Sequence, residues 1–208
     1  MHYGFVAVPA AVEALEREFA AVWPHYQLTH SAALASLDDW FDWKRRNERF
    51  VAARDWTPEN LDVEVFGFLQ DGDWAVLLDT SHTLTTNAEA LARLSLTFGR
   101  CLSFVIETAG GCASFAAYRQ GQLQRSIDNV DGKVDTQGQP LPEEEGLDIG
   151  GYYMDETEAL QQRLGFRAFS GEAPIGILAI ATVDRTDYSE QLPRIAPLLE
   201  KKPWWKLW

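Results

Sequence analysis

The stretch of sequence that decides the fold is residues 102–130, which read LSFVIETAGGCASFAAYRQGQLQRSIDNV. Two short glycine-containing turns, at 110–111 and 120–121, separate three apolar or alternating segments, 102–108, 112–119 and 122–130. Glycine adopts the left-handed backbone that tight turns require, and strands joined by turns this short run antiparallel. The stretch therefore predicts a three-stranded antiparallel meander.

Segments on both sides of the meander extend the predicted sheet. From Asp62 onward apolar residues recur with a period of two, Asp71-Gly72-Asp73 forms a turn, and residues 74–78 return. This pattern is typical of a β-hairpin. Two further apolar runs, residues 3–8 and 175–183, are expected strands, whereas residues 25–35 show no decisive period.

Other segments carry apolar residues at helical spacing and predict helices that flank the sheet. Ser36 is suited to cap one of them, and Thr86-Asn87-Ala88-Glu89 matches a capping box before another. Gly99 and Gly165 are natural helix stops. The expected helices are residues 12–22, a helix from 36 that finishes before Thr57-Pro58, 88–98, a short helix from 155 or 157 to 164, and 189–200, which its prolines limit.

These elements predict one α+β domain over residues 1–208, with a central antiparallel β-sheet (meander) flanked by helices. The core is expected to come from the sheet and the helices that cover it. Its expected members are Val65, Trp74, Val76, Leu78, Leu94, Phe104, Ile106, Phe115, Ile177 and Ile180.

The charge balance constrains the partners. The chain has 208 residues, with 18 Lys and Arg against 31 Asp and Glu, a formal net charge of -13. Such a surface repels nucleic-acid phosphates and anionic lipid, so binding to either is not expected. A basic protein partner is the natural complement, although acidity also serves solubility alone.

Cysteine usage and the absence of targeting patterns suggest a cytoplasmic protein. Cys101 and Cys112 are the only cysteines, which excludes a disulfide framework and a Cys-x-x-Cys zinc site. Both lie in apolar surroundings and are expected to be buried thiols. No basic segment followed by an apolar run opens the chain, and no apolar run is long enough to span a membrane.

Residues 127–158 differ from the rest of the chain in composition. They hold ten acidic residues and a single basic one, Lys133, and glycines and prolines are spread between 131 and 151. We therefore expect an acidic loop at 128–151, and loops this long are uncommon unless they are functional or disordered. The aromatic tail, residues 203–208, holds Trp204, Trp205 and Trp208 and is expected to pack on its own domain or on a partner.

The best candidate for catalysis is Asp79-Thr80-Ser81-His82, which follows a predicted strand. A histidine at a strand end can act as a general base when a carboxylate orients it. However, Ser81 and His82 are adjacent and would point to opposite faces, and no nucleophile-elbow motif accompanies them. A polar loop is the alternative interpretation.

No motif predicts a metal or a cofactor. His2, His25 and His30 form no metal-ligand pattern, and the run from Asp128 to Asp135 has the wrong spacing for a calcium loop. The glycine patterns of nucleotide-binding sites are also missing.

Three segments together resemble a known class of protein. Residues 118–125, YRQGQLQR, residues 138–144, GQPLPEE, and Leu160 to Leu164-Gly165 resemble a layout in small acidic bacterial proteins of uncharacterised or immunity type. The resemblance covers roughly residues 60–165. Members encoded beside polymorphic toxins, including type VI secretion effectors, neutralise a cognate toxin by binding it. These families share no catalytic residues, so the resemblance implies binding without chemistry.

The leading hypothesis is a non-enzymatic binding protein, an immunity protein that occludes a cognate toxin with an acidic surface. Two alternatives remain: a small hydrolase-type enzyme using Asp79 and His82, and a scaffold subunit that docks through its Trp-rich C-terminus. The surface around Trp40 and Trp43 is the next candidate interface, and the oligomeric state is left open. The expected partner-binding residues are Asp128, Asp131, Asp135, Glu143, Glu144, Glu145, Asp148, Trp204, Trp205 and Trp208.

Overall fold

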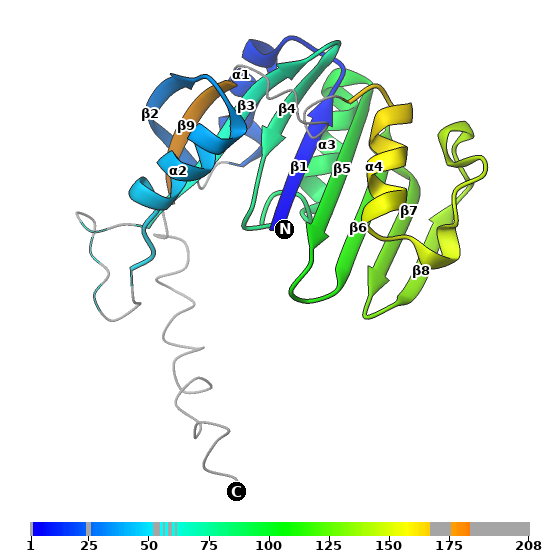
Figure 1. The fold of residues 1–208 in the computed structure, drawn as a ribbon. Helices are drawn as coiled ribbons and strands as arrows, with labels where there is room; N and C mark the ends of the chain where they lie inside the picture. The colour runs from blue at the N-terminus through cyan, green and yellow to red at the C-terminus, as the bar shows by residue number, and fades with distance from the viewer. Residues whose placement is uncertain are drawn as a thin grey trace, which may run out of the picture.

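A computed structural model describes residues 2–23, 26–51, 55, 57, 60, 62–166 and 176–183. Within them, nine strands form one sheet in the order β2-β9-β3-β4-β1-β5-β6-β7-β8, and every neighbouring pair is antiparallel (Figure 1). The strands are β1 His2–Val8, β2 Tyr26–Leu34, β3 Val63–Asp71, β4 Trp74–Leu78, β5 Arg100–Glu107, β6 Cys112–Arg119, β7 Gln122–Val130, β8 Lys133–Gly138 and β9 Gly176–Val183. The helices are α1 Val12–Val22, α2 Leu37–Asn47, α3 Ala88–Phe98 and α4 Met154–Arg163, with short 3-10 turns η2 Pro142–Glu144 and η3 Ile149–Gly151.

The predicted α+β class, with an antiparallel sheet flanked by helices, is confirmed. The meander is β5-β6-β7, and the hairpin at Gly72 is β3-β4. Ser36 caps α2 as expected, since its Oγ accepts a hydrogen bond from the backbone N–H of Asp39 at 3.1 Å. At α3 the capping residue is Asn87 and not Thr86: the Asn87 Oδ1 accepts from the N–H of Ala90 at 3.0 Å.

Helices cover both faces of the sheet because its central strands are apolar on both faces. α1 and α3 pack on one face, with Leu15, Phe19 and Leu94 in the core on that side; we call it the α3 face. α2 and α4 pack on the other face, which we call the α4 face, where Trp40 and Leu160 join the core (Figure 1). β3 illustrates the pattern, because its residues from Glu64 to Leu69 are all buried.

Most of the predicted core is buried. Trp74 is the exception among the described side chains: it is only partly buried, because it follows the hairpin turn and its indole N–H donates to the Leu164 carbonyl at 3.1 Å. The side chains of Ile177 and Ile180 lie outside the described residues. The confirmed core residues are Val65, Val76, Leu78, Leu94, Phe104, Ile106 and Phe115.

The expectation of one acidic loop over 128–151 is wrong for residues 128–138, whereas 139–151 contain only irregular chain and the two 3-10 turns. Residues 128–130 complete β7, and 133–138 form β8, which pairs with β7 along its length. Asp131 and Gly132 adopt φ values of 52° and 77°, the left-handed conformations of a two-residue hairpin turn. The composition resembles that of a loop, but Asp-Gly between two extended segments is itself a hairpin signal.

Other expectations meet mixed outcomes. The undecided stretch 25–35 contains β2, which pairs with β9, and α2 ends at Asn47, well before Thr57. Cys101 and Cys112 are free thiols; the first is buried and the second is only partly buried. They lie at opposite ends of the β5-β6 hairpin, because Cys101 faces Tyr118 and Cys112 faces Glu107. The segments 189–200 and 203–208 lie outside the described residues.

Candidate functional site

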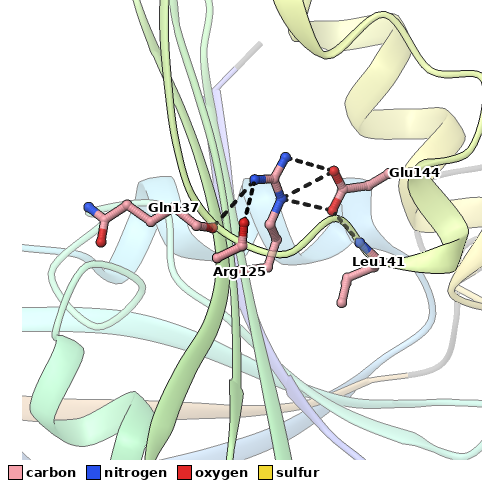
Figure 2. A network of polar contacts seen from close by, with 5 residues as sticks. Arg125, Gln137, Leu141 and Glu144 are labelled. Carbon is pink, nitrogen blue, oxygen red and sulfur yellow. Dashed lines mark hydrogen bonds and ion pairs between the residues drawn. The ribbon is translucent and has the colours of Figure 1, made fainter.

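A buried ion pair organises the region that the sequence marks as acidic. Arg125 on β7 binds the carboxylate of Glu144 in η2: its Nε donates to Oε1 at 2.9 Å and to Oε2 at 3.1 Å, and its Nη2 donates to Oε2 at 2.8 Å (Figure 2). Each residue is only 4% exposed. Charge-assisted hydrogen bonds from a guanidinium fork are short and directional. The pair therefore fixes η2 against the sheet.

Further hydrogen bonds hold the chain around this pair. The Glu144 Oε1 also accepts from the Leu141 N–H at 2.9 Å, and Arg125 Nη1 reaches the carbonyls of Gln137 and Gly138 at 3.4 and 3.5 Å (Figure 2). From α4, the Arg163 Nη1 donates to the carbonyls of Glu143 and Glu145. Residues 141–145 are thus held from the sheet and from α4.

Glu144 therefore does not belong to a partner-facing surface, and its inclusion among the expected binding residues is wrong. Arg125 is buried as well. The two-residue alternation of side chains along a strand could have predicted this burial. Arg125 and Ile127 are two residues apart on one strand, so their side chains lie on the same face of the sheet. Ile127 is fully buried in the core, and Arg125 must then point inward too.

The remaining acidic residues divide between two parts of the surface. Asp128 and Asp135 face each other across β7 and β8, and both are exposed, as is Asp131 in the turn between them. Glu143, Glu145 and Asp148 lie instead in the segment that packs beside α4. Glu145 and Asp148 are exposed and Glu143 is partly buried. The seven carboxylates therefore do not form one continuous patch.

A hollow lies next to Asp128 on the α3 face, between α3 and the far end of the sheet. Its volume is about 240 Å³, and Asp128, Ser114, Ser126, Tyr118, Leu123 and Gln137 are among its lining residues. Asp135 shares its strand face with Gln137, so its carboxylate belongs to the same side of the sheet. Burial, and then the charges of Cys101 and Asp128, raise the pKa of Tyr118.

One exposed leucine lies at the edge of the hollow, and a second lies at the β6-β7 turn. Leu123 at its edge is 38% exposed, and Leu96 on α3 is 67% exposed. Leu96 lies over the β6-β7 turn, since a Cβ added at Gly121 would be 3.1 Å from it. The hollow thus combines hydroxyl groups, the Asp128 carboxylate and an exposed leucine at its edge.

Asp79, the carboxylate of the predicted catalytic cluster, holds its own loop together. Its Oδ1 accepts from the N–H and Oγ of Ser81 at 3.1 and 2.7 Å. Its Oδ2 accepts from the N–H groups of Leu84 and Thr85 at 2.7 and 3.0 Å. Both oxygens of this fully buried carboxylate are therefore engaged in loop structure. These contacts do not support the enzymatic alternative, in which Asp79 would orient His82.

His82 itself packs against β1. It has a left-handed backbone with φ of 60°, and a Cβ added at Gly4 would lie 2.7 Å from its Nδ1. Only glycine at position 4 leaves room for this imidazole.

A second buried carboxylate, Glu64 on β3, lies near the same loop. It is 7% exposed, and its Oε2 has no hydrogen-bond partner among the described residues. Burial raises its pKa; a hydrogen bond with Tyr26 opposes the shift, and the charge of Asp79 adds to it. Glu64 can therefore hold a proton more readily than an exposed glutamate, and no local pattern in the sequence distinguishes it.

The tryptophans expected at an interface are either buried or partly buried, or lie outside the described residues. Trp40 is buried under α2 and Trp43 is partly buried, so these two rings contribute little exposed surface. Trp204, Trp205 and Trp208 lie outside the described residues. Within the described ranges, no group of three or more histidine, cysteine or acidic side chains is arranged to hold a metal ion. No helix in those ranges is both long and apolar enough to cross a membrane.

Comparison with known proteins adds no relative. No family model matches the chain, and neither a curated protein nor a solved structure is significantly similar to it.

Proposed function

We propose that this protein is a non-enzymatic binding protein that captures a basic protein partner on the α3 face of β7 and β8. Within that class, we propose the function that the sequence resemblance implies: an immunity protein that neutralises a toxin by occluding it, acting in the cytoplasm. The binding surface is narrower than the sequence suggests. It consists of the β7-β8 hairpin and the adjacent hollow and does not include the segment beside α4.

The observation that carries this proposal is the pairing of Asp128 with Asp135. The two carboxylates are directly opposite in the β7-β8 register, and Asp131 adds a third in the turn. Like charges placed directly opposite on a sheet destabilise it. Lys133, the neighbouring base, offsets only part of this charge. A lysine or arginine from a partner would relieve the repulsion, so the facing carboxylates favour binding of a cationic side chain.

The hollow beside Asp128 suits the stem of such a side chain. Tyr118 and Leu123 offer apolar contact for the methylene groups, while Ser114 and Ser126 offer hydroxyl oxygens to the cationic head. The exposed Leu123 at the edge of the hollow adds apolar area. Protein interfaces commonly combine apolar contacts with polar and charged groups.

The mechanism is steric. The chain's overall charge of -13 attracts a basic partner over long range, and the hairpin then covers the partner's functional surface. Complementary charge raises association rates above the neutral range of about 10⁵–10⁶ M⁻¹s⁻¹. The enzymatic alternative has less support, because the Asp79 carboxylate already serves its own loop.

The test begins with a pull-down and mass spectrometry to identify a direct partner, followed by kinetics with that purified partner. Asp128→Lys with Asp135→Lys should slow association at least tenfold at low salt, and the effect should shrink at moderate salt because ions screen the long-range approach. The matched control is Glu145→Lys with Asp148→Lys, which makes the same charge change beside α4.

The comparison between the two double variants decides the location of the surface. A larger loss for the β7-β8 variant supports the proposal. Equal losses would mean that only net charge matters. A larger loss for the control would move the interface to the segment beside α4.

A further inference from the structure

A second and larger cavity lies at the opposite end of the meander from the Asp131 turn. Its volume is about 570 Å³, and it is formed by the ends of β5 and β6, the last turn of α3 and residues 141–143. This volume falls in the range of small-molecule pockets, about 300–1,000 Å³. The proposed function makes no use of it.

Two arginines line this cavity from neighbouring strands. Gly99 ends α3 with φ of 81°, so that Arg100 begins β5, and Arg119 ends β6 just before the turn to β7. Arg100 and Arg119 are directly opposite in the β5-β6 register, and both line the cavity. Two like charges in opposite positions destabilise the sheet, and here they lie in a protein with a strong excess of acid.

The contacts of Arg100 leave its charge largely available. Its Nη2 is 4.0 Å from the Glu143 Oε1, which is the outer limit of an ion pair, and its guanidinium lies 5.7 Å from the centre of the Trp74 ring. Burial lowers the pKa of Arg100, the charge of Glu143 opposes this shift, and the charge of Arg119 adds to it. The positive charge of Arg119 therefore acts on Arg100.

The lining specifies the class of ligand. Arg100, Arg119 and Glu143 are the charged side chains among the lining residues, and together they leave one net positive charge. Apolar wall is supplied by Pro9, Phe98 and Leu141. A guanidinium pair binds a planar carboxylate through parallel hydrogen bonds, and one net positive charge matches a monoanion better than a phosphate dianion.

The wall at 141–143 is preformed. The buried Arg125–Glu144 pair and the Arg163 contact hold this segment in place without a ligand. Preorganisation lowers the cost of binding because the segment does not have to be ordered by the ligand.

We propose that this cavity binds a small monocarboxylic acid with an apolar body, with the carboxylate between Arg100 and Arg119 and the body against Phe98 and Leu141. The inference does not rest on the proposed binding to a basic protein, which is centred on Asp128 and Asp135 at the other end of β7, although Tyr118 lines both hollows.

The test is NMR titration of the whole protein with 3-phenylpropionate, with 3-phenylpropionamide as the neutral analogue and inorganic phosphate as the competing anion. The acid should shift the amide signals of Gly99, Arg119 and Leu141 in a saturable way, and the amide should bind at least tenfold more weakly. Equal binding of acid and amide, absence of saturable binding of the acid, or tighter binding of phosphate would each overturn the proposal.

Substitutions of the charged residues provide a second test of the proposed binding site. Arg119→Gln at an exposed strand end should weaken binding of the acid at least tenfold, whereas Arg93→Gln, an exposed arginine on α3 outside the cavity, should leave it unchanged. Glu143→Gln should tighten binding, because it removes the carboxylate that competes for Arg100. Unchanged affinity in folded Arg119→Gln, or weaker binding in Glu143→Gln, would contradict the assigned orientation.

Discussion

Arg125 on β7 and Glu144 in η2 are 19 residues apart in the chain, yet their side chains meet in a buried pair with Nη2 and Oε2 2.8 Å apart. Removing one partner of such a pair leaves a charge without compensation in the interior. Glu144→Leu is therefore expected to reduce the free energy of unfolding by about 3–5 kcal/mol. Urea denaturation at neutral pH measures the change.

The matched control for this prediction is the double variant Arg125→Met with Glu144→Leu. It replaces both charges with apolar groups, and such replacements are often neutral or stabilising. The double variant should be more stable than the single one. A single-variant loss below about 1 kcal/mol would show that the pair is dispensable for the fold.

Gly138 ends β8 with φ of 79°, and a Cβ there would lie 1.8 Å from the Gln124 carbonyl oxygen. A backbone atom cannot move aside as a flexible side chain can, so Gly138→Ala is expected to destabilise by about 3 kcal/mol or more. Gly132→Ala is the control, because Gly132 has φ of 77° but nothing within 4 Å of the added carbon. It should cost only about 1–2 kcal/mol, the strain of a left-handed residue. Similar losses in thermal melts of the two variants would contradict the close approach.

Asp128→Asn should stabilise the free protein. It removes one of two like charges that face each other across β7 and β8, and cross-strand pairs contribute about 0.2–1 kcal/mol. Chemical denaturation at low salt gives the largest difference, because salt screens the repulsion. Asp148→Asn, an exposed carboxylate outside the hairpin, is the control and should have a smaller effect. A loss of stability in Asp128→Asn would mean that Asp128 has a structural role.

The fold follows from local patterns more completely than the site does. Alternation and turn glycines predict β5, β6 and β7, and Gly99 ends α3 as expected. These signals act within a few residues, so one chain segment contains them entirely. In the acidic segment, amino-acid composition alone wrongly predicts a loop, because Asp131-Gly132 forms a hairpin turn inside it.

The sites depend on contacts between distant segments. Glu144 has the same sequence neighbourhood as Glu143 and Glu145, yet only Glu144 reaches a buried arginine on β7. Nothing local distinguishes the three. The pairing of Asp128 with Asp135, by contrast, follows once the hairpin turn is assigned, because the turn fixes the register.

The last prediction concerns pH and Glu64 on β3. Burial raises the pKa of this carboxyl above its ordinary value of 4.5, and the charges of Asp79 and Glu48 add to the shift, while hydrogen bonds with Tyr26 and Ser81 oppose it. The folded protein therefore holds this proton more tightly than the unfolded chain. The resulting stabilisation is fully present below pH 4.5 and is lost as the pH rises through the folded-state pKa.

The variant Glu64→Gln has no carboxylate charge at any pH but keeps a carbonyl acceptor for Tyr26. It should be more stable than the wild type at neutral pH, and the advantage should shrink toward pH 4. Chemical denaturation of both proteins across this range isolates the contribution, with the exposed Glu145→Gln as the control. A difference between Glu64→Gln and wild type that does not change with pH would show that burial does not shift the titration of Glu64.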